Sequence, residues 1–280
     1  MRRWILALSL ALPAQFVQSG QLAQDKPAIP QGKPAAAQGL DVLTQALAEQ
    51  KILLEPELGL CAIPAAVDIR DDLLEYLLVN PRGNAHESLF TTEVGASPLN
   101  VALLALGVQA GSNAVWIPRD PPPTREEQLA GISSYSVTPP KGDGFLLYVA
   151  WKSKGETYFF RIEDLLRNTE TGRSMRRHEW VYLGSRSVQS RKDPAQSLFV
   201  AELDGNLINL ALFEAGTTLI TAALDECLKQ TIWLSNAWLL PEQGERVLLI
   251  FSRAKLDTLP KRLESALPEV TDAPAEGHGR

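Results

Sequence analysis

Residues 74–111 read LEYLLVNPRGNAHESLFTTEVGASPLNVALLALGVQAG and contain the strongest structural pattern in the chain. The pattern predicts a strand, a tight Pro-Arg-Gly loop, a second strand, a turn and a helix. Residues 73–79 are apolar on both alternating faces, which is typical of a central strand covered on both sides. Ser97 can cap the helix and Pro98 suits its first position, so we expect one clear helix at about residues 97–106.

Outside this segment the dominant pattern is that of β-strands separated by turn residues. The Asp204-Gly205-Asn206 segment is a strong hairpin signal, because Asp and Gly both tolerate positive φ. We therefore expect an α+β fold that is mainly antiparallel β with hairpins. The remaining predicted strands cover residues 58–69, 145–151, 157–161, 180–183, 198–203, 207–212 and 246–251.

The pattern of composition along the chain predicts one folded domain over residues 51–255. Two arginines followed by a short apolar core and small residues predict a signal peptide over residues 1–19, with an uncleaved membrane anchor as the alternative. We expect a flexible linker with a possible short helix over residues 20–50, and a mostly disordered tail over residues 256–280. The mature protein is expected to be periplasmic or extracellular, without a transmembrane segment.

Composition narrows the class of partner and cofactor. The formal charge is −6 and the isoelectric point is about 5.3, which argues against a nucleic-acid partner. The chain contains no phosphate-binding or dinucleotide-binding glycine motif, and two cysteines alone cannot hold an iron–sulfur cluster. Export would allow Cys61 and Cys227 to form a disulfide, and two buried thiols are the alternative.

His86 and Glu87 follow the Pro-Arg-Gly loop and form the most suggestive polar pair. Neighbours on a strand face opposite ways, so the two side chains can converge only if His86 still belongs to the loop. A buried Glu87 would need a partner, and Arg82 is the nearest in sequence. The alternative is structural, with Glu87 locking the loop to the strand. A metal site of His86, Glu87 and His178 is a weaker alternative, because Phe90 stands where H-E-x-x-H needs its second histidine.

Several blocks of this chain, taken in order, resemble blocks of the YdjY-type domain family. They are NAHESL at 84–89, SPLNVALLALG at 97–107, WVYLGS at 180–185, AELDG at 201–205 and NAWLLP at 236–241. The resemblance implies an exported bacterial protein whose activity is uncharacterised. Some relatives carry ferredoxin-like cysteine clusters, and their absence here means that no electron-transfer role is implied for this chain.

We expect a non-catalytic protein of the cell envelope that binds an unidentified ligand or protein partner. No complete catalytic set is present, so no residue is assigned a catalytic role. The alternative is an envelope enzyme, metal-assisted in one version, that uses His86 and Glu87. The candidate ligand-binding residues come from the loop and from the positions that match the family, and they are Arg82, His86, Glu87, Ser88, Trp180, Ser185 and Asp204.

Overall fold

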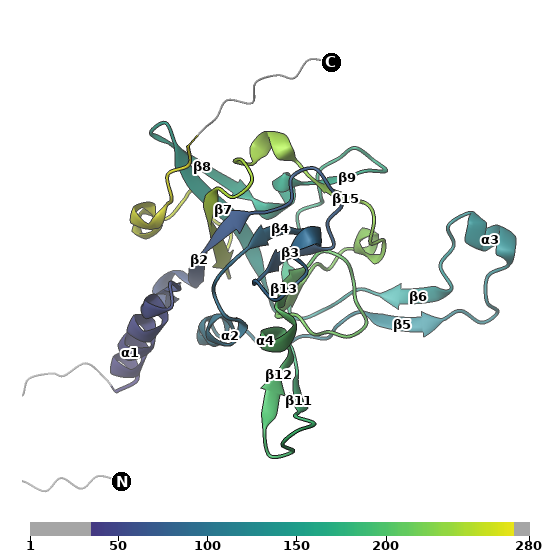
Figure 1. Cartoon of the computed structure of the whole chain (residues 1–280), viewed down its shortest axis with the longest axis horizontal. Helices are drawn as coiled ribbons and strands as arrows, with labels where there is room; N and C mark the ends of the chain where they lie inside the picture. Colours follow the sequence, from purple (N-terminus) through teal and green to yellow (C-terminus); the bar gives the residue numbers. More distant parts are fainter. Residues whose placement is uncertain (1–34, 272–280) are drawn as a thin grey trace, which may run out of the picture.

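The structure is a computed structural model that describes residues 35–271, and eight of its strands close into a β-barrel (Figure 1). The closure runs through β4, which pairs with β2 at Ala66↔Thr91 and Val67↔Phe90. The strand order around the barrel is β2 (Leu60–Val67), β16 (Arg246–Ser252), β7 (Gly144–Ser153), β10 (Trp180–Tyr182), β14 (Ile220–Thr221), β13 (Asn206–Asn209), β3 (Tyr76–Val79) and β4 (Ser88–Thr91).

The barrel is a mixed sheet, which corrects the expectation of a fold made mainly of antiparallel hairpins. The pairs β3–β4 and β13–β14 are parallel, and the other neighbours in the barrel are antiparallel. Strand β8 (Glu156–Arg161) does form the predicted hairpin with β7, and β1 (Leu53–Glu55) adds to one end of β2. Apolar alternation shows where strands lie but not which strands pair, so the parallel pairs could not be read from the pattern.

The hairpin predicted around Asp204-Gly205 is wrong. Residues 200–204 form the short helix α4 (Val200–Asp204), which follows β12 (Ser197–Phe199) and ends at Gly205 with a φ of 75°. A helix end and a hairpin turn both favour a glycine at positive φ, so the local signal was correct about the backbone and not about the element. Strand β12 pairs instead with β11 (Ser187–Gln189) in a separate two-stranded ribbon.

The order predicted for residues 74–111 is confirmed. Strand β3 leads through a loop and the 3-10 turn η2 (Ala85–Glu87) to β4, and then to α2 (Ala96–Ala105). The helix begins one residue before the expected start, with Gly95 at its N-cap. Ser97 therefore lies inside the first turn rather than capping it, and its backbone N–H donates to Glu202 Oε2 at 2.9 Å.

Residues 256–271 differ from the expected disordered tail, because they cover an apolar outer face of the barrel. Leu263, in the 3-10 turn η6 (Lys261–Ala266), is fully buried and packs with a cluster that includes Leu60, Tyr148 and Ile250. The backbone beyond it is fixed to β7, since the Lys152 carbonyl accepts a hydrogen bond from the Val270 N–H at 2.9 Å. The regularly spaced leucines of this segment supply the cover that the barrel face needs.

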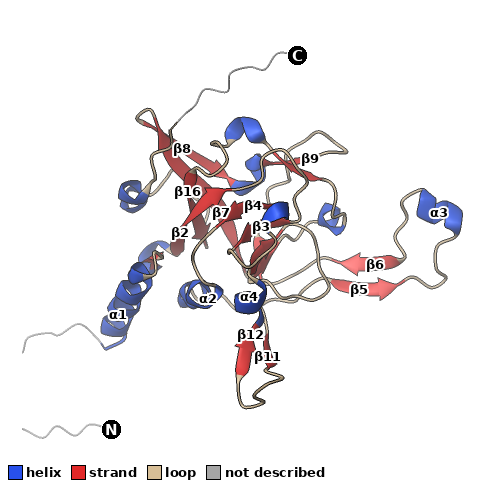
Figure 2. Cartoon of the chain, viewed as in Figure 1, coloured by secondary structure: helices blue, strands red, loops and turns tan. Residues whose placement is uncertain are grey.

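Helices, turns and short strands surround the barrel (Figure 2). An arm of β5 (Val115–Pro118) and β6 (Tyr135–Thr138), tipped by α3 (Arg125–Leu129), projects away from it (Figure 1). Helix α1 (Ala35–Glu49) is longer than the short helix expected there. The signal peptide predicted for residues 1–19, the linker up to residue 34 and the tail beyond residue 271 lie outside the described residues. The remaining elements are β9 (Leu166–Asn168), β15 (Trp233–Ser235), η1 (Pro56–Leu58), η3 (Ile162–Leu165), η4 (Asp225–Leu228) and η5 (Ala237–Leu239).

The two cysteines are buried and unpaired, so of the two alternatives the structure shows separate thiols. Across residues 35–271, no helix has both the length and the apolar character that crossing a bilayer requires.

Candidate functional site

The parallel pairing of β3 with β4 brings two acidic residues together. Tyr76 stands opposite Ser88 in the register, so Glu75 and Glu87, which precede these residues, are neighbours as well. The Glu75 N–H donates to the Glu87 carbonyl at 3.0 Å. His86 lies in the turn η2 and not in the strand, and its Nε2 is 3.6 Å from Glu87 Oε1. The convergent arrangement of His86 and Glu87 that the sequence left open is therefore the one that forms.

This cluster is acidic and reaches Tyr76. Burial raises the pKa of Glu75, the charge of Glu87 adds to the rise, and His86 opposes it. Burial also raises the pKa of Tyr76 to about 12, with further contributions from Glu75, Glu87 and Asp204, while the Asn84 side chain opposes the rise. These pKa shifts show that three carboxylates act on one phenol, so the region favours a positive charge.

A cavity of about 220 Å³ opens beside Tyr76. The rings of Tyr76 and Phe213 stack at its wall with centroids 5.3 Å apart and planes 18° apart. Asp204 and Asn206 line it from the end of α4 and the start of β13, and Asn113 and residues 215–218 complete the wall. The Asp204 carboxylate forms no hydrogen bond or ion pair with any residue in the described range, so it is an available acceptor.

The loop that carries His86 is held against the loop that carries Asp204. The Asn84 N–H donates to Asn206 Oδ1 at 2.9 Å, and the Asn80 N–H donates to the Gly205 carbonyl at 2.8 Å. A Cβ added at Gly83 would collide with this second loop, so the close approach requires glycine. Two of the blocks that carry the family resemblance thus form one rigid unit.

Arg82 does not pair with Glu87, which corrects the partner predicted for that carboxylate. Its Nη1 donates to the Glu202 carbonyl at 3.1 Å, so the side chain joins the loop to α4. His86 is instead the neighbour of Glu87, and the His86 side chain is 76% exposed. Proximity in sequence favoured Arg82, but the loop turns its side chain toward α4.

The two candidate serines have structural roles. Ser88 is fully buried and its hydroxyl donates to the Phe90 carbonyl at 2.9 Å. Ser185, at a φ of 55°, donates to the Thr217 carbonyl at 2.5 Å and accepts the Ala201 N–H at 3.1 Å. Ser185 therefore fixes a wall of the cavity, because Thr217 lines it.

Trp180 and His178 belong to a different, buried cluster around Glu163. Trp180 Nε1 donates to Glu163 Oε1 at 3.1 Å, and Arg161 binds both carboxylate oxygens at 2.6 and 2.9 Å. His178 Nδ1 lies 3.7 Å from the same carboxylate and 3.1 Å from the Arg176 carbonyl. Burial lowers the pKa of His178, although the charge of Glu163 opposes this.

The structure does not bring His178 to the pair of His86 and Glu87. Each histidine has its own carboxylate partner, Glu163 for His178 and Glu87 for His86. Among residues 35–271, no group of three or more histidine, cysteine, aspartate or glutamate side chains is arranged to hold a metal ion. The three-residue metal set considered from the sequence is thus not assembled.

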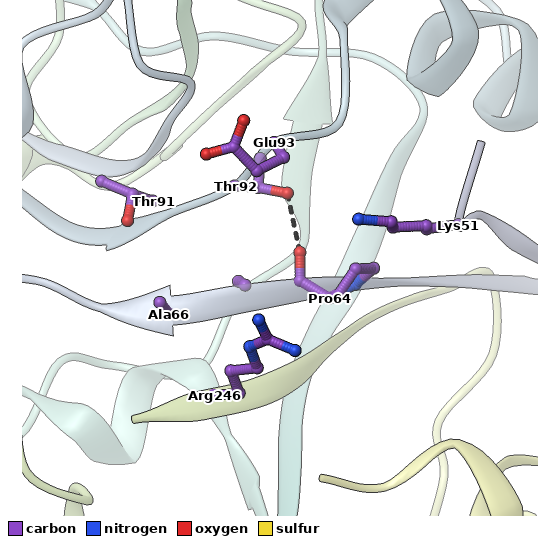
Figure 3. Close-up of a pocket in the computed structure, with 8 residues that line it drawn as sticks. Lys51, Pro64, Ala66, Thr91, Thr92, Glu93 and Arg246 are labelled. Carbon is purple, nitrogen blue, oxygen red and sulfur yellow. Dashed lines mark hydrogen bonds between the residues drawn. The ribbon is translucent and has the colours of Figure 1, made fainter. Parts of the chain in front are cut away.

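A second hollow, of about 210 Å³, lies where the barrel wall has a gap (Figure 3). Strand β2 pairs with β1 at residues 60–62 and with β4 at residues 66–67, which leaves Pro64 between them. Proline has no N–H to leave unpaired there, and its carbonyl accepts the Thr92 hydroxyl at 2.7 Å. Figure 3 shows Lys51 and Arg246 near Pro64, on separate segments, and Glu93 beyond Thr92, so this hollow is lined by charges of both signs.

Sequence reasoning missed Glu75, Tyr76, Phe213 and Glu163. Glu75 carried a signal, because it is the single charge in the apolar run of residues 73–79. Phe213 and Tyr76 are far apart in the chain, and Glu163 is distant from Trp180, so nothing local indicated those contacts. Of the predicted site residues, Asp204 lines the cavity and Ser185 is hydrogen-bonded to Thr217 in its wall. The cavity lining does not include Arg82, His86, Glu87, Ser88 or Trp180.

Comparison with known proteins agrees with the sequence resemblance. A family model described as the YdjY domain matches residues 64–252, which is more than half of the chain of 280 residues. No curated protein matches the chain, and no solved structure matches it. The matched range includes all eight strands of the barrel except the first residues of β2, and it contains the loop that carries His86 and the residues that line the cavity. The chain therefore belongs to the YdjY domain family.

Proposed function

We propose that this YdjY domain is an exported, non-catalytic binding protein whose ligand is a small polar molecule with a positively charged amine. The ligand occupies the cavity beside Tyr76. The observation that carries the proposal is the unpaired Asp204 carboxylate at this cavity, together with Glu75 and Glu87 close to the same phenol. Export is supported by the leader pattern of residues 1–19.

The charges favour a cation over an anion. Like charges in a partly buried site repel, and an added positive charge removes that repulsion. The stacked rings of Tyr76 and Phe213 also present aromatic surface, which attracts cations. An amine supplies several N–H donors in addition to its charge.

The amide at the cavity wall supports a ligand that donates hydrogen bonds. Asn113 uses its Nδ2 to donate to the carbonyls of Phe213 and Glu214, at 2.8 and 3.1 Å. Its Oδ1 has no partner among the described residues and is left as an acceptor. The acceptors of Asn113 and Asp204 therefore line one cavity, which matches the donor-rich end of an amine.

The serine hydroxyl groups near the site support a non-catalytic role, because they are already hydrogen-bonded. Ser88 and Ser185 already use their hydroxyls in hydrogen bonds to backbone carbonyls, and Ser88 has no exposure to solvent. A nucleophilic serine needs a neighbouring base that takes its proton. His86 is paired with Glu87 and not with either hydroxyl.

Isothermal titration calorimetry with putrescine and spermidine tests the proposal, with glutamate as an anionic comparison. We expect saturable binding of the amines and none of glutamate. Asp204→Asn should weaken amine binding at least about tenfold, or about 1.4 kcal/mol. Glu126→Gln makes the same change of charge on the projecting arm and should leave binding unaltered. The proposal fails if neither amine binds, or if both variants bind like the parent chain.

The second candidate is an enzyme that uses His86 and Glu87, because His86 Nε2 and Glu87 Oε1 converge at 3.6 Å on an accessible turn. Its metal-assisted version would need a ligand from outside the described residues, since no third ligand completes a metal set among them. It requires stoichiometric metal in protein purified without chelator, and loss of that metal in His86→Ala. Our proposal expects an unchanged melting temperature after EDTA treatment and no metal that depends on His86. Elemental analysis of the parent chain and the variant separates the two candidates.

A further inference from the structure

Trp238 is the most exposed large apolar side chain among the described residues, at 91%. It lies in the turn η5, in the NAWLLP segment that follows β15. Exposing a large aromatic side chain to water is unfavourable, and burying it against a ligand lowers the free energy. A binding role would therefore explain a tryptophan that is 91% exposed.

The turn that carries Trp238 is tied firmly to the body of the protein. Arg70 Nη2 donates to the Ala237 carbonyl at 3.0 Å, and its Nη1 pairs with Glu242. The Asn236 N–H donates to the Leu165 carbonyl at 2.7 Å, and its Nδ2 donates to the Asp164 carbonyl at 3.2 Å. These contacts fix the backbone on both sides of Trp238, so little ordering of the turn is needed when a ligand binds.

A cavity of about 280 Å³ lies beside this indole, with Arg70, Asp71, Arg167 and Trp238 in its lining. The Asp71 carboxylate and the Arg167 guanidinium form no side-chain hydrogen bond or ion pair with the part of the chain that the structure describes. A second cavity of about 380 Å³ shares Arg70 and Asp71 with the first, but its lining also contains Asp68, Asp72 and Glu242 and is therefore acidic. The site thus offers an aromatic platform, an unpaired acceptor and an unpaired donor.

The chemistry of these groups selects the ligand class. In the cavity beside Trp238, an anion would meet Asp71, and a cation would meet Arg70 and Arg167, so neither charge is favoured. A neutral ligand that both donates and accepts hydrogen bonds, and that has a flat apolar face for the indole, satisfies every group. Sugar rings have these properties, because their hydroxyls donate and accept and their C–H faces stack on aromatic rings. We propose that Trp238 and the cavity beside it form a saccharide-binding site that takes a short neutral oligosaccharide.

The site is separate from the amine cavity, and the two share no lining residue. The saccharide proposal therefore goes beyond the proposed function and can fail without it. Asp204→Asn should reduce amine binding and leave saccharide binding unchanged, and Trp238→Ala should do the reverse.

Calorimetry and ligand-observed NMR with three neutral trisaccharides provide the test: chitotriose, cellotriose and maltotriose. We expect at least one to bind with a Kd of about 1 mM or lower. Trp238→Ala should weaken this binding at least about tenfold, and Trp238→Phe should restore part of it because it keeps an aromatic face. Arg167→Gln should also weaken binding, since it removes the charged donor.

Leu129→Ala is the matched control, because Leu129 is also strongly exposed but lies on the arm far along the chain from this site. It should bind the trisaccharide like the parent chain. Melting temperatures of all variants should stay close to that of the parent, because the substituted side chains are exposed. The proposal is overturned if no trisaccharide binds, if Trp238→Ala binds normally, or if Trp238 proves necessary only for binding a protein.

Discussion

Glu163→Gln offers a direct measure of what the buried ion cluster contributes to stability. The Glu163 side chain has no exposure to solvent and accepts two hydrogen bonds from Arg161, whose side chain is only 10% exposed. It also accepts the Trp180 indole N–H. Neutralising one partner of a buried ion pair leaves the other charge uncompensated, at a cost of about 3–5 kcal/mol. This is a large part of the roughly 5–15 kcal/mol that folded domains have in total.

The neighbouring residue supplies a matched control. Asp164 pairs with Arg177 at 2.7 Å, but these side chains are 29% and 58% exposed. Exposed pairs contribute only about 0–1 kcal/mol, so Asp164→Asn should change the free energy of unfolding far less than Glu163→Gln does. Urea denaturation followed by circular dichroism measures both variants. Equal losses in the two variants would show that burial does not set the strength of these pairs, and the argument would be wrong.

Three further outcomes are expected. Because burial lowers the pKa of His178 from 6.5, neutral His178 favours the folded state above about pH 6.5 and this stability is lost as the pH falls toward the folded pKa. His178→Gln should therefore show a smaller fall in melting temperature on acidification than the parent, and equal falls would contradict this. Leu263→Ala should lower the free energy of unfolding by about 2–5 kcal/mol in urea denaturation, whereas a disordered tail would give no change. Burial raises the pKa of Cys61 and Cys227, that of Cys227 to about 12, so both thiols should resist a disulfide reagent in the native protein and react once it is unfolded.

The sequence predicted what depends on neighbouring residues. The order of strand, loop, strand and helix over residues 74–111 follows from apolar spacing and turn residues, which act locally. Strand positions such as 145–151 and 157–161 were found for the same reason. The hairpin prediction at residues 204–205 failed because a hairpin turn and a helix end both favour glycine at positive φ. Only the surrounding packing selects between these two elements.

The barrel and its cavity depend on contacts between distant parts of the chain. The parallel register that places Glu75 beside Glu87 has no local signature, although each glutamate is visible in the sequence. The sequence did not indicate a buried cluster at Glu163, because its partners Trp180 and His178 lie in and just before β10, far along the chain. The YdjY resemblance identified the loop that carries His86 and the loop that carries Asp204 without showing that they meet.

The pairing of β2 with β16 affects when the barrel can fold. Strand β2 lies near the start of the domain, yet seven of its residues pair with β16, which ends at Ser252. The barrel cannot close until the ribosome has delivered nearly the whole domain, since β16, the last strand, lies between β2 and β7 and joins them. A nascent chain of this topology stays open for most of its synthesis.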